Sequence, residues 1–386
     1  LFSAGNTSTE IGKVQDTLGK YKYFLLFDLA AIIGFEKKML ASESMHLVID
    51  WLISELKLNK TDKEYLYHSR DAMLGNDILW KSIKSHCVMK SYQEYVNAII
   101  TNIDFIEKKP YKILVTATMS AGKSTFVNAL TGKNVSLSQN MACTSKRHSV
   151  LSKPYEDGYA YEYDHELVMD AGKEELLDDN DSNHANKIIV STYYNGLLGG
   201  KRLIIHDSPG VNYSGNVGHK DISNQLIRSK DYQLLIYVMN ATQLGTNDDA
   251  EHLQFVKQHI GRKKMLFVVN KIDAFNIDEE NIEAAMRKQI KHLENKGFKK
   301  PYICPVSSRA AYLSRKSENS ALTRVEQREL NCFIDDFEQM ELSKYYDKYF
   351  PEISIPDEES EEKQLVKNCG IAYVEQMILK LYREAR

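Results

Sequence analysis

The segment best suited to chemistry is a loop of small residues between an apolar run and a helical pattern. Residues 113–117 read Ile-Leu-Val-Thr-Ala, and the loop ends in Gly122-Lys123-Ser124. Backbone N–H groups in such a loop can ring a phosphate, helped by the dipole of the following helix. Lys123 would reach the β- and γ-phosphates, and the Ser124 hydroxyl would ligate Mg²⁺. The predicted phosphate-binding residues are Met119, Ser120, Ala121, Gly122, Lys123, Ser124 and Thr125, in a GxxxxGK[ST] pattern whose first Gly is replaced by Ala117.

Asp207-Ser-Pro-Gly210 is a second motif, and it follows the apolar run 201–206. Asp207 can hold Mg²⁺ through water, and the Gly210 N–H can contact the γ-phosphate. Between the two motifs, Thr144 is the best candidate to complete the Mg²⁺ shell and to hold the attacking water. The alternative is that Thr144 is an ordinary loop threonine.

Lys146 and Arg147 stand directly after this candidate switch threonine. Their charges could compensate the charge of the transferred phosphoryl group, in the same molecule or in a partner. We favour the alternative that both side chains are ordinary solvated charges.

A third motif, Asn270-Lys271-Ile-Asp273, follows the apolar run 265–269. The Asp273 carboxylate can accept two hydrogen bonds from the N1–H and the exocyclic amine of guanine. Adenine lacks this donor pair, so the motif selects GTP over ATP. Lys271 would lie against the base, and Asn270 would tie this loop to the phosphate loop. The next expected strand ends at Ser307-Ser308-Arg309, where a backbone N–H can contact the guanine O6. The predicted guanine site therefore comprises Asn270, Lys271, Asp273, Ser307, Ser308 and Arg309.

The distribution of proline divides the chain at residue 110. All seven prolines lie at or beyond this position, and none occurs in the first 109 residues. Apolar stripes at helical spacing over 45–56 and 92–106 predict a helical subdomain there. The alternative is a bundle completed by helices of a missing segment or another chain. The apolar run 24–35 is 12 residues long, too short to cross a bilayer.

Beyond residue 110, short apolar runs alternate with helical patterns. This texture predicts an α/β fold with a mostly parallel central sheet flanked by helices. The expected divisions are a helical subdomain at 1–109, a GTPase core at 110–311, a helical and acidic insertion at 312–368, and a closing helix at 369–386. The expected strands are 111–116, 187–194, 201–206, 233–239, 264–269 and 302–306, and the expected helices are 123–130, 248–259, 280–295 and 324–340. We expect the polar segments 174–183 and 357–362 to be exposed loops.

The charge balance and the cysteine pattern limit the partners and the cellular location that we expect for this protein. The 50 Lys and Arg residues balance 53 Asp and Glu residues, so no nucleic acid is expected as a partner. The five cysteines are scattered without a CxxC pair, so neither a disulfide framework nor a zinc site follows from them, and a reducing, cytoplasmic location is favoured. The chain begins at Leu1 and ends within a helical pattern, so we expect the natural protein to be longer.

Taken together, residues 117–124, Cys143-Thr144-Ser145, Asp207–Gly210 and Asn270–Asp273 resemble the GTPase domain of the dynamin superfamily, particularly its bacterial dynamin-like members. The tract 239–247 is similar to one that the family also carries. The resemblance covers about residues 111–310 and the final helix from Gly370. Ala117 stands where many members have Gly, and Met119 stands where they have Gln.

The resemblance implies GTP hydrolysis with Mg²⁺, and a role for Ser120 in positioning water or a monovalent cation, K⁺ or Na⁺. Ser120, Lys123 and Thr144 are the expected catalytic residues. The resemblance further implies a homodimer across the nucleotide faces, with a paralogue as another partner. Membrane lipid would be bound at the inner face of the membrane through a stalk and tip absent from this chain.

Val211 stands where small Ras-like GTPases carry the glutamine that orients water. We therefore expect slow basal hydrolysis that rises on dimerisation. Two alternatives remain: a regulatory GTPase of another class, acting in ribosome assembly or the cell cycle, and a weakly hydrolysing interaction scaffold.

Overall fold

The computed structural model describes residues 108–118, 120–136, 147–156, 158–163, 167–168, 171–172, 176, 187–208, 217–245, 247–275, 281–340 and 342–385, and nine earlier positions. The chain divides into two compact units, 1–109 and 110–386. The division falls at the first proline. The nine earlier positions (50, 54, 60, 63, 64, 67, 101, 104 and 105) are all helical. The predicted helical subdomain at 1–109 stays a prediction. Most of the two predicted apolar stripes, and the run 24–35, lie outside the described residues.

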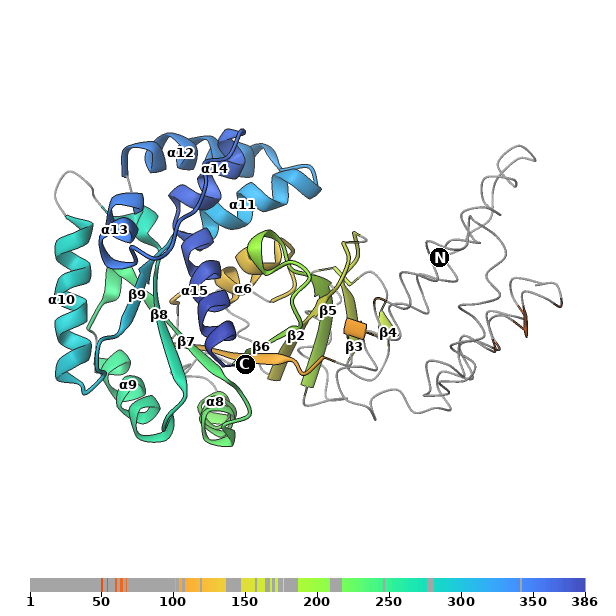
Figure 1. Cartoon of the computed structure of the whole chain (residues 1–386), viewed down its shortest axis with the longest axis horizontal. Coiled ribbons are helices and arrows are strands. Elements are labelled where there is room, and N and C mark those ends of the chain that lie inside the picture. Colours follow the sequence, from red (N-terminus) through yellow and green to blue (C-terminus); the bar gives the residue numbers. More distant parts are fainter. Residues whose placement is uncertain are drawn as a thin grey trace. The chain divides into compact units, whose positions relative to one another are not determined.

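The second unit is built on one mixed sheet (Figure 1). Its described strands follow the order β4-β3-β5-β2-β6-β1-β7-β8-β9. The five strands from β6 to β9 in this order run parallel, as do β2 and β5. Three pairings are antiparallel: β2 with β6, β3 with β5, and β3 with β4. The strand bounds are β1 Tyr111–Ala117, β2 Arg147–Lys153, β3 Tyr161–Tyr163, β4 Leu167–Val168, β5 Lys187–Tyr193, β6 Leu203–Asp207, β7 Leu234–Asn240, β8 Lys264–Asn270 and β9 Tyr302–Pro305.

The expected α/β fold with a mostly parallel sheet is confirmed, and all six expected strands are present within a few residues. β2, β3 and β4 were not predicted. β2 reads Arg-His-Ser-Val-Leu-Ser-Lys, which is too polar to indicate a buried strand. Its polar residues after Arg147 are nevertheless buried, and β2 lies between β5 and β6 in the sheet. Tertiary position overrides local composition here.

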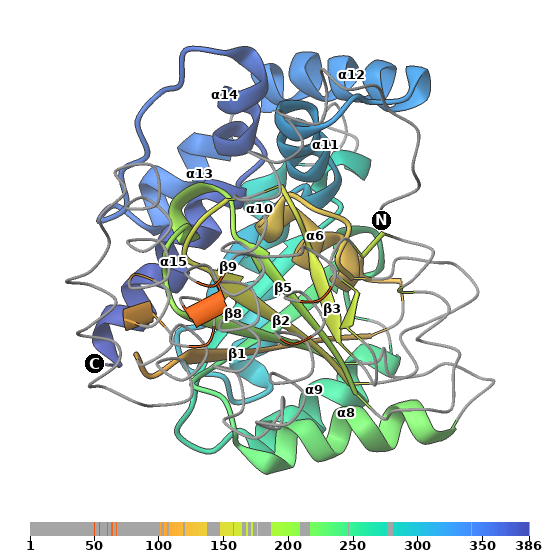
Figure 2. The ribbon, with the colours of Figure 1, turned by 90° about the vertical axis from the view of Figure 1, so that its right-hand side faces the viewer.

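Helices cover both faces of the sheet (Figures 1 and 2). α6 and α15 lie on one face, and α8, α9 and α10 lie on the other. α8, α11, α13 and α14 were not among the expected helices. The bounds are α6 Lys123–Thr131, α8 Val217–Ser229, α9 Asn247–His259, α10 Ile282–Asn295, α11 Ser308–Asn319, α12 Arg324–Met340, α13 Leu342–Tyr349, α14 Glu361–Asn368 and α15 Ile371–Glu384, with 3₁₀ turns η1 Gly196–Leu198, η2 Ala241–Gln243 and η3 Ile272–Ala274.

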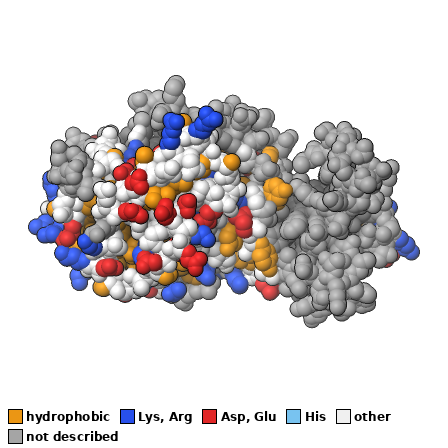
Figure 3. All heavy atoms as spheres, turned by 90° about the horizontal axis from the view of Figure 1, so that it is seen from above, with side chains coloured by type: hydrophobic (Ala, Val, Ile, Leu, Met, Phe, Trp, Pro, Cys, Tyr) orange, Lys and Arg blue, Asp and Glu red, His pale blue; other side chains and the backbone are white. Residues whose placement is uncertain are grey.

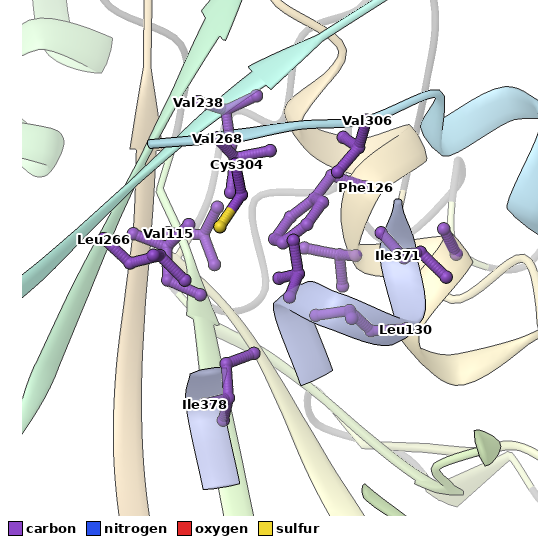
Figure 4. Close-up of a cluster of buried hydrophobic side chains, with 14 of the residues drawn as sticks. Val115, Phe126, Leu130, Val238, Leu266, Val268, Cys304, Val306, Ile371 and Ile378 are labelled. Atoms are coloured by element: carbon purple, nitrogen blue, oxygen red, sulfur yellow. The ribbon is translucent and has the colours of Figure 1, made fainter. Parts of the chain in front are cut away.

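The core on the α6 side is a layer of buried side chains from the central strands and two helices (Figure 4). α6 begins at the end of the phosphate loop and packs beside α15, the last helix of the chain. The close-up labels Val115, Phe126, Leu130, Val238, Leu266, Val268, Cys304, Val306, Ile371 and Ile378. The position of α6, and with it the loop, is therefore fixed by residues from both ends of this unit.

A buried ion pair between α11 and α15 also connects these helices to α6. Arg315 of α11 lies 2.6 Å from Glu375 of α15, and both side chains are almost fully buried. The same guanidinium donates to the Ala129 carbonyl of α6, and Glu375 accepts from the Leu197 backbone N–H at 3.1 Å. Burial raises the pKa of Glu375, although Arg315 opposes that rise.

Segment 312–368 closes the outer edge of the sheet. α13 lies along β9, the last strand, where Tyr345 donates to the Ile303 carbonyl at 2.9 Å and Tyr346 donates to the Pro305 carbonyl at 2.6 Å. Tyr346 also stacks on Tyr373 of α15, with ring centroids 4.0 Å apart. These tyrosines occupy backbone acceptors that an open edge would offer to another strand.

Two expected loops differ from the structure. Leu176, within 174–183, is a buried helical residue. The acidic run 357–362 ends in α14, because Ser360 caps the helix by accepting from Lys363 N–H, and Glu361 and Glu362 form its first turn. Carboxylates favour a helix N-terminus, so this acidic sequence suits the helix start as well as a loop. Seen from above, Asp and Glu side chains gather over this part of the molecule (Figure 3).

Candidate functional site

The loop between β1 and α6 has the backbone shape of a phosphate cradle. Ser120 has φ 60° and Gly122 has φ 80°, both in the left-handed region. A Cβ at Gly122 would lie 2.3 Å from Nδ2 of Asn270. Glycine is therefore required at 122 both for its φ and for this close approach. Ala117, which replaces the first Gly of the motif, is the last residue of β1 and does not have a positive φ, so the backbone does not require glycine there.

Asn270 connects three segments of the site. Its Nδ2 donates to the Ala121 carbonyl at 2.9 Å, and its Oδ1 accepts from the Ser308 N–H at 2.9 Å. Asn270 ends β8 and is buried. The side chain thus holds the phosphate loop against the start of α11, which is the tie that the sequence led us to expect of this residue.

Lys123 and Asp207 form a buried ion pair at the carboxyl ends of β1 and β6. Nζ of Lys123 contacts Oδ1 of Asp207, and the Ser136 hydroxyl donates to Oδ2. Both charged side chains are nearly inaccessible. The phosphate-loop lysine and the candidate metal carboxylate therefore lie side by side. Ser136 was missed because nothing in its local sequence distinguishes it from any loop serine.

The Asp273 carboxylate lies in the 3₁₀ turn η3, directly after β8. Lys271 precedes it with φ 64°, and the Ile272 N–H donates to the Val306 carbonyl at 3.2 Å. Oδ1 of Asp273 is buried and has no hydrogen-bond partner in the described structure. A buried acceptor without a donor is costly, which suits a ligand that brings N–H groups to it. Guanine presents such a pair.

Ser307, Ser308 and Arg309, which follow β9, each form a different hydrogen bond within the protein. Ser307 caps α11 by accepting from the Ala310 N–H, and the Ser308 N–H is already bonded to Asn270. Arg309 forms a two-bond pair with Glu329 of α12, at 2.9 and 2.7 Å. This hydrogen-bonded partner raises the pKa of Arg309, against the effect of burial. The Arg309 side chain is thus held against α12, and the Ser308 N–H is engaged within the protein.

Two further supports were not predicted. Asn240 ends β7, and its amide approaches the Ser120 carbonyl at 3.5 Å while its Oδ1 accepts from the Thr242 N–H at 3.1 Å. On the opposite face of the sheet, Thr116 of β1 contacts Nε2 of His252 at 2.9 Å. Asn240 lies within the tract 239–247 that the family resemblance had already marked.

The oxygen atoms present suit Mg²⁺. The ion is typically bound by one or two carboxylates together with substrate phosphates. Ser124 opens α6 next to Lys123, and Asp207 is buried beside it. In the described part of the chain, no group of three or more His, Cys, Asp or Glu side chains is arranged to hold a metal ion. This donor set matches an ion shared with a phosphate ligand.

Several predicted site residues cannot be placed. Met119, Thr144, Lys146 and Gly210 lie outside the described residues. Arg147 is described as the first residue of β2, and its Nε is buried without a hydrogen-bond partner. Their roles remain predictions.

Residues 113–272 match the family model described as Dynamin family. The matched range begins in β1 and includes the phosphate loop, Asp207 and Asn270. This part of the chain is similar to the dynamin-family GTPase domain. Within it, the Lys123–Asp207 pair and the unpartnered Asp273 oxygen lie at the carboxyl ends of parallel strands, where α/β folds bind ligands.

A search of curated proteins gives no significant match. Among solved structures, a bacterial dynamin pair described as sensing and tethering membranes is 16% identical, with a TM-score of 0.42 over 93% of this chain and 62% of that one. A variant of Aquifex aeolicus Era bound to GDP and AlF₄⁻ is 18% identical, with a TM-score of 0.31 over 52% of each chain. The G domain of the T. maritima FeoB iron transporter is 13% identical, with a TM-score of 0.30 over 55% of this chain and 96% of that one. The chain thus spans about half the length of Era.

Proposed function

We propose that this protein binds GTP and hydrolyses it to GDP and phosphate with Mg²⁺, and that it dimerises through its nucleotide face. Lys123 would neutralise the β- and γ-phosphates, and Ser124 with Asp207 would hold Mg²⁺, Asp207 through water. Mg²⁺ would supply charge neutralisation on the phosphate oxygens. Ser120 and Thr144 would position the attacking water, and Ser120 would also face a K⁺ or Na⁺ ion.

The observation that carries the proposal is the buried, unpartnered Oδ1 of Asp273, close in sequence to Asn270, which ties β8 to the phosphate loop. A carboxylate can only accept hydrogen bonds at neutral pH, so it selects a base edge with two adjacent donors. Guanine has this edge. A site built to bond a substrate N–H group rejects analogues that lack it by a large factor.

Replacing Asp273 by Asn tests the base directly. An amide offers one acceptor and one donor, which matches the N1–H and the C2 carbonyl of xanthine. We expect Asp273→Asn to lose GTP affinity by about 10²-fold or more and to gain affinity for xanthosine triphosphate. Titration of both nucleotides into both proteins measures the exchange, with ATP as the unbound control. Equal binding of ATP and GTP by the unmodified protein would contradict the proposal.

Dimerisation is tested by dilution. If groups from a second molecule complete the site, the hydrolysis rate per molecule should rise with protein concentration. Sedimentation with GDP and AlF₄⁻ should then show a dimer, and Lys123→Ala should show neither the dimer nor hydrolysis. Constant activity per molecule over a hundredfold dilution would contradict assembly through the nucleotide face.

The membrane role rests on the family alone. No described helix is long and apolar enough to cross a bilayer. We propose that lipid binding belongs to a segment outside this sequence, that the full protein works at the cytoplasmic face of a membrane, and that a paralogue acts as a further partner. Liposome flotation of a longer protein, with and without GTP, tests this.

A further inference from the structure

His148 is the buried polar side chain that the site as described leaves unexplained. It is the second residue of β2 and is completely inaccessible. Neither ring nitrogen has a hydrogen-bond partner among the residues that the structure describes. Leaving both nitrogens of a buried imidazole unpaired is costly, and such a group calls for an explanation.

The register of the sheet places His148 beside the ion pair. His148 lies directly opposite Asp207 in the antiparallel pairing of β2 with β6. Directly opposed residues project to the same face, with Cβ atoms about 4.5–5.5 Å apart. Asp207 and Lys123 are also the two charged groups that act on the ring electrostatically. The imidazole therefore lies next to the Lys123–Asp207 pair.

A neutral imidazole has one donor and one acceptor, so it can bond a carboxylate and a hydroxyl or water at once. Burial is the main cause that lowers the pKa of His148 to about 4, with Lys123 adding to the fall and Asp207 opposing it. The register of the sheet places the ring within reach of Asp207, so an imidazole N–H can donate to that carboxylate.

We propose that His148 is a positioning residue for Asp207 that forms its hydrogen bonds when nucleotide and Mg²⁺ are bound. In the described structure Lys123 occupies Oδ1 of Asp207, and Ser136 occupies Oδ2. When Lys123 turns to a phosphate, Oδ1 loses its donor. The N–H of His148 would then replace it, and the second ring nitrogen would be able to accept a hydrogen bond from water. This rests on the proposed GTPase function.

The inference predicts opposite effects on stability and on metal affinity. His148→Leu removes a buried unpaired polar group from the nucleotide-free protein, so its melting temperature should rise by about 2–4 °C. The same change removes the proposed hydrogen bond from His148 to Asp207, the carboxylate that would hold Mg²⁺ through water. The Mg²⁺ concentration that half-maximally slows release of a fluorescent GDP analogue should rise about 10-fold or more. A residue with only a structural role would not give this pair of effects.

His206 provides the matched control. It is also a buried histidine, adjacent to Asp207, and burial lowers its pKa to about 3. As the neighbouring residue of β6 it faces the other side of the sheet, where Nδ1 contacts the Ser149 hydroxyl at 3.0 Å. His206→Leu should leave the Mg²⁺ dependence of release unchanged. His148→Gln, which keeps a donor and an acceptor, should lie closer to the unmodified protein than His148→Leu.

The outcomes are distinguishable. A His148→Leu variant that is less stable than the unmodified protein, or that keeps its Mg²⁺ dependence, overturns the inference. Equal Mg²⁺ shifts in His148→Leu and His206→Leu overturn it as well. If the unmodified protein shows no Mg²⁺-dependent retention of the GDP analogue, the proposed function fails and the inference fails with it.

Discussion

A buried ion pair lies at each end of α6, and the two pairs differ in their hydrogen-bond partners. At the first turn, Lys123 contacts one carboxylate oxygen of Asp207, and the Ser136 hydroxyl donates to the other. At the last turn, Arg315 and Glu375 are also bonded to the Ala129 carbonyl and the Leu197 N–H. The second pair thus connects α6, α11, α15 and η1.

The number of hydrogen bonds that each pair makes indicates whether the pair can be exchanged for a ligand. A lysine ammonium is a mobile point charge, whereas an arginine guanidinium is a rigid fork that bonds several partners at once. If Lys123 binds phosphate as we propose, the Lys123–Asp207 pair opens when the phosphate takes the place of the carboxylate. The Arg315–Glu375 pair cannot open without leaving buried groups unpaired. One pair is therefore exchangeable, and the other holds the helix that carries the loop.

Breaking the structural pair should have the largest effect. Arg315→Met leaves Glu375 buried and uncompensated, so we expect the free energy of unfolding to fall by about 3–5 kcal/mol. Urea denaturation of the nucleotide-free protein measures this. Arg309→Met, which removes the more exposed pair with Glu329, is the control and should cost about 1 kcal/mol or less. Equal losses in the two variants would refute the structural assignment.

Breaking the exchangeable pair should instead abolish the response to nucleotide. GDP with Mg²⁺ at 100 times its Kd should stabilise the unmodified protein by about 2.7 kcal/mol. Lys123→Met should lose most of this increment, and its hydrolysis rate should fall about 10²–10³-fold, as when a transition-state donor is removed. Thermal shift with and without nucleotide provides the measurement. Retention of the full increment by Lys123→Met would show that the lysine does not bind phosphate.

Gly196 tests how tightly the structural pair is packed. A Cβ at Gly196 would lie 2.3 Å from Nη2 of Arg315, whereas a Cβ at Gly200 would meet nothing within 4 Å. Both glycines have φ +66°, so Gly200→Ala measures the backbone strain alone. We expect Gly196→Ala to cost about 1–3 kcal/mol more than Gly200→Ala. Under conditions where both variants are fully folded, Gly196→Ala and Gly200→Ala should bind nucleotide with the same affinity. Equal free energies of unfolding for the two variants would contradict the close packing of Gly196 against Arg315.

A pair near the surface extends the comparison and should give the smallest effect. Glu326 accepts from Lys316 at 2.6 Å and from the Thr323 N–H and hydroxyl at 3.0 Å, forming the N-terminal cap of α12. Burial alone would raise the pKa of Glu326, but these hydrogen bonds outweigh it and lower the pKa to about 2.

The folded-state pKa of Glu326 thus lies below its unfolded value of about 4.5, so the unfolded chain binds more protons between these values. The stabilisation is present above pH 4.5 and is lost as the pH falls towards 2. We expect under about 1 kcal/mol, measured as the difference between the unmodified protein and Glu326→Gln in urea melts at pH 6 and pH 3. A difference that does not change with pH would contradict the assigned cap.

Much of the site was predictable because its residues are local. Gly122-Lys123-Ser124 and Asn270–Asp273 each combine a strand end, a tight turn and the chemical group in a few positions. Gly122 has to be glycine because of its φ and the approach of Asn270. Short apolar runs likewise predicted the parallel strands, since a strand covered by helices on both faces must be apolar throughout.

Other features depend on contacts between residues distant in the chain. Arg315 and Glu375 are 60 positions apart, and Ser136 and Asp207 are 71 apart. Nothing in the local pattern around these residues marks them as partners. β2 is polar in sequence and buried only because β5 and β6 flank it, which also brings His148 opposite Asp207.

The sequence by itself determined the predicted chemistry: which groups we expect to bind phosphate, metal and guanine, and the order along the chain of the strands that present them. The tertiary structure decided how those groups are held. It paired Lys123 with Asp207, engaged Arg309 with Glu329, and fixed α6 from its far end through Arg315. The physical reason is that a motif specifies groups along a few residues, whereas the partner of a buried charge is chosen by whichever distant element the fold packs against it.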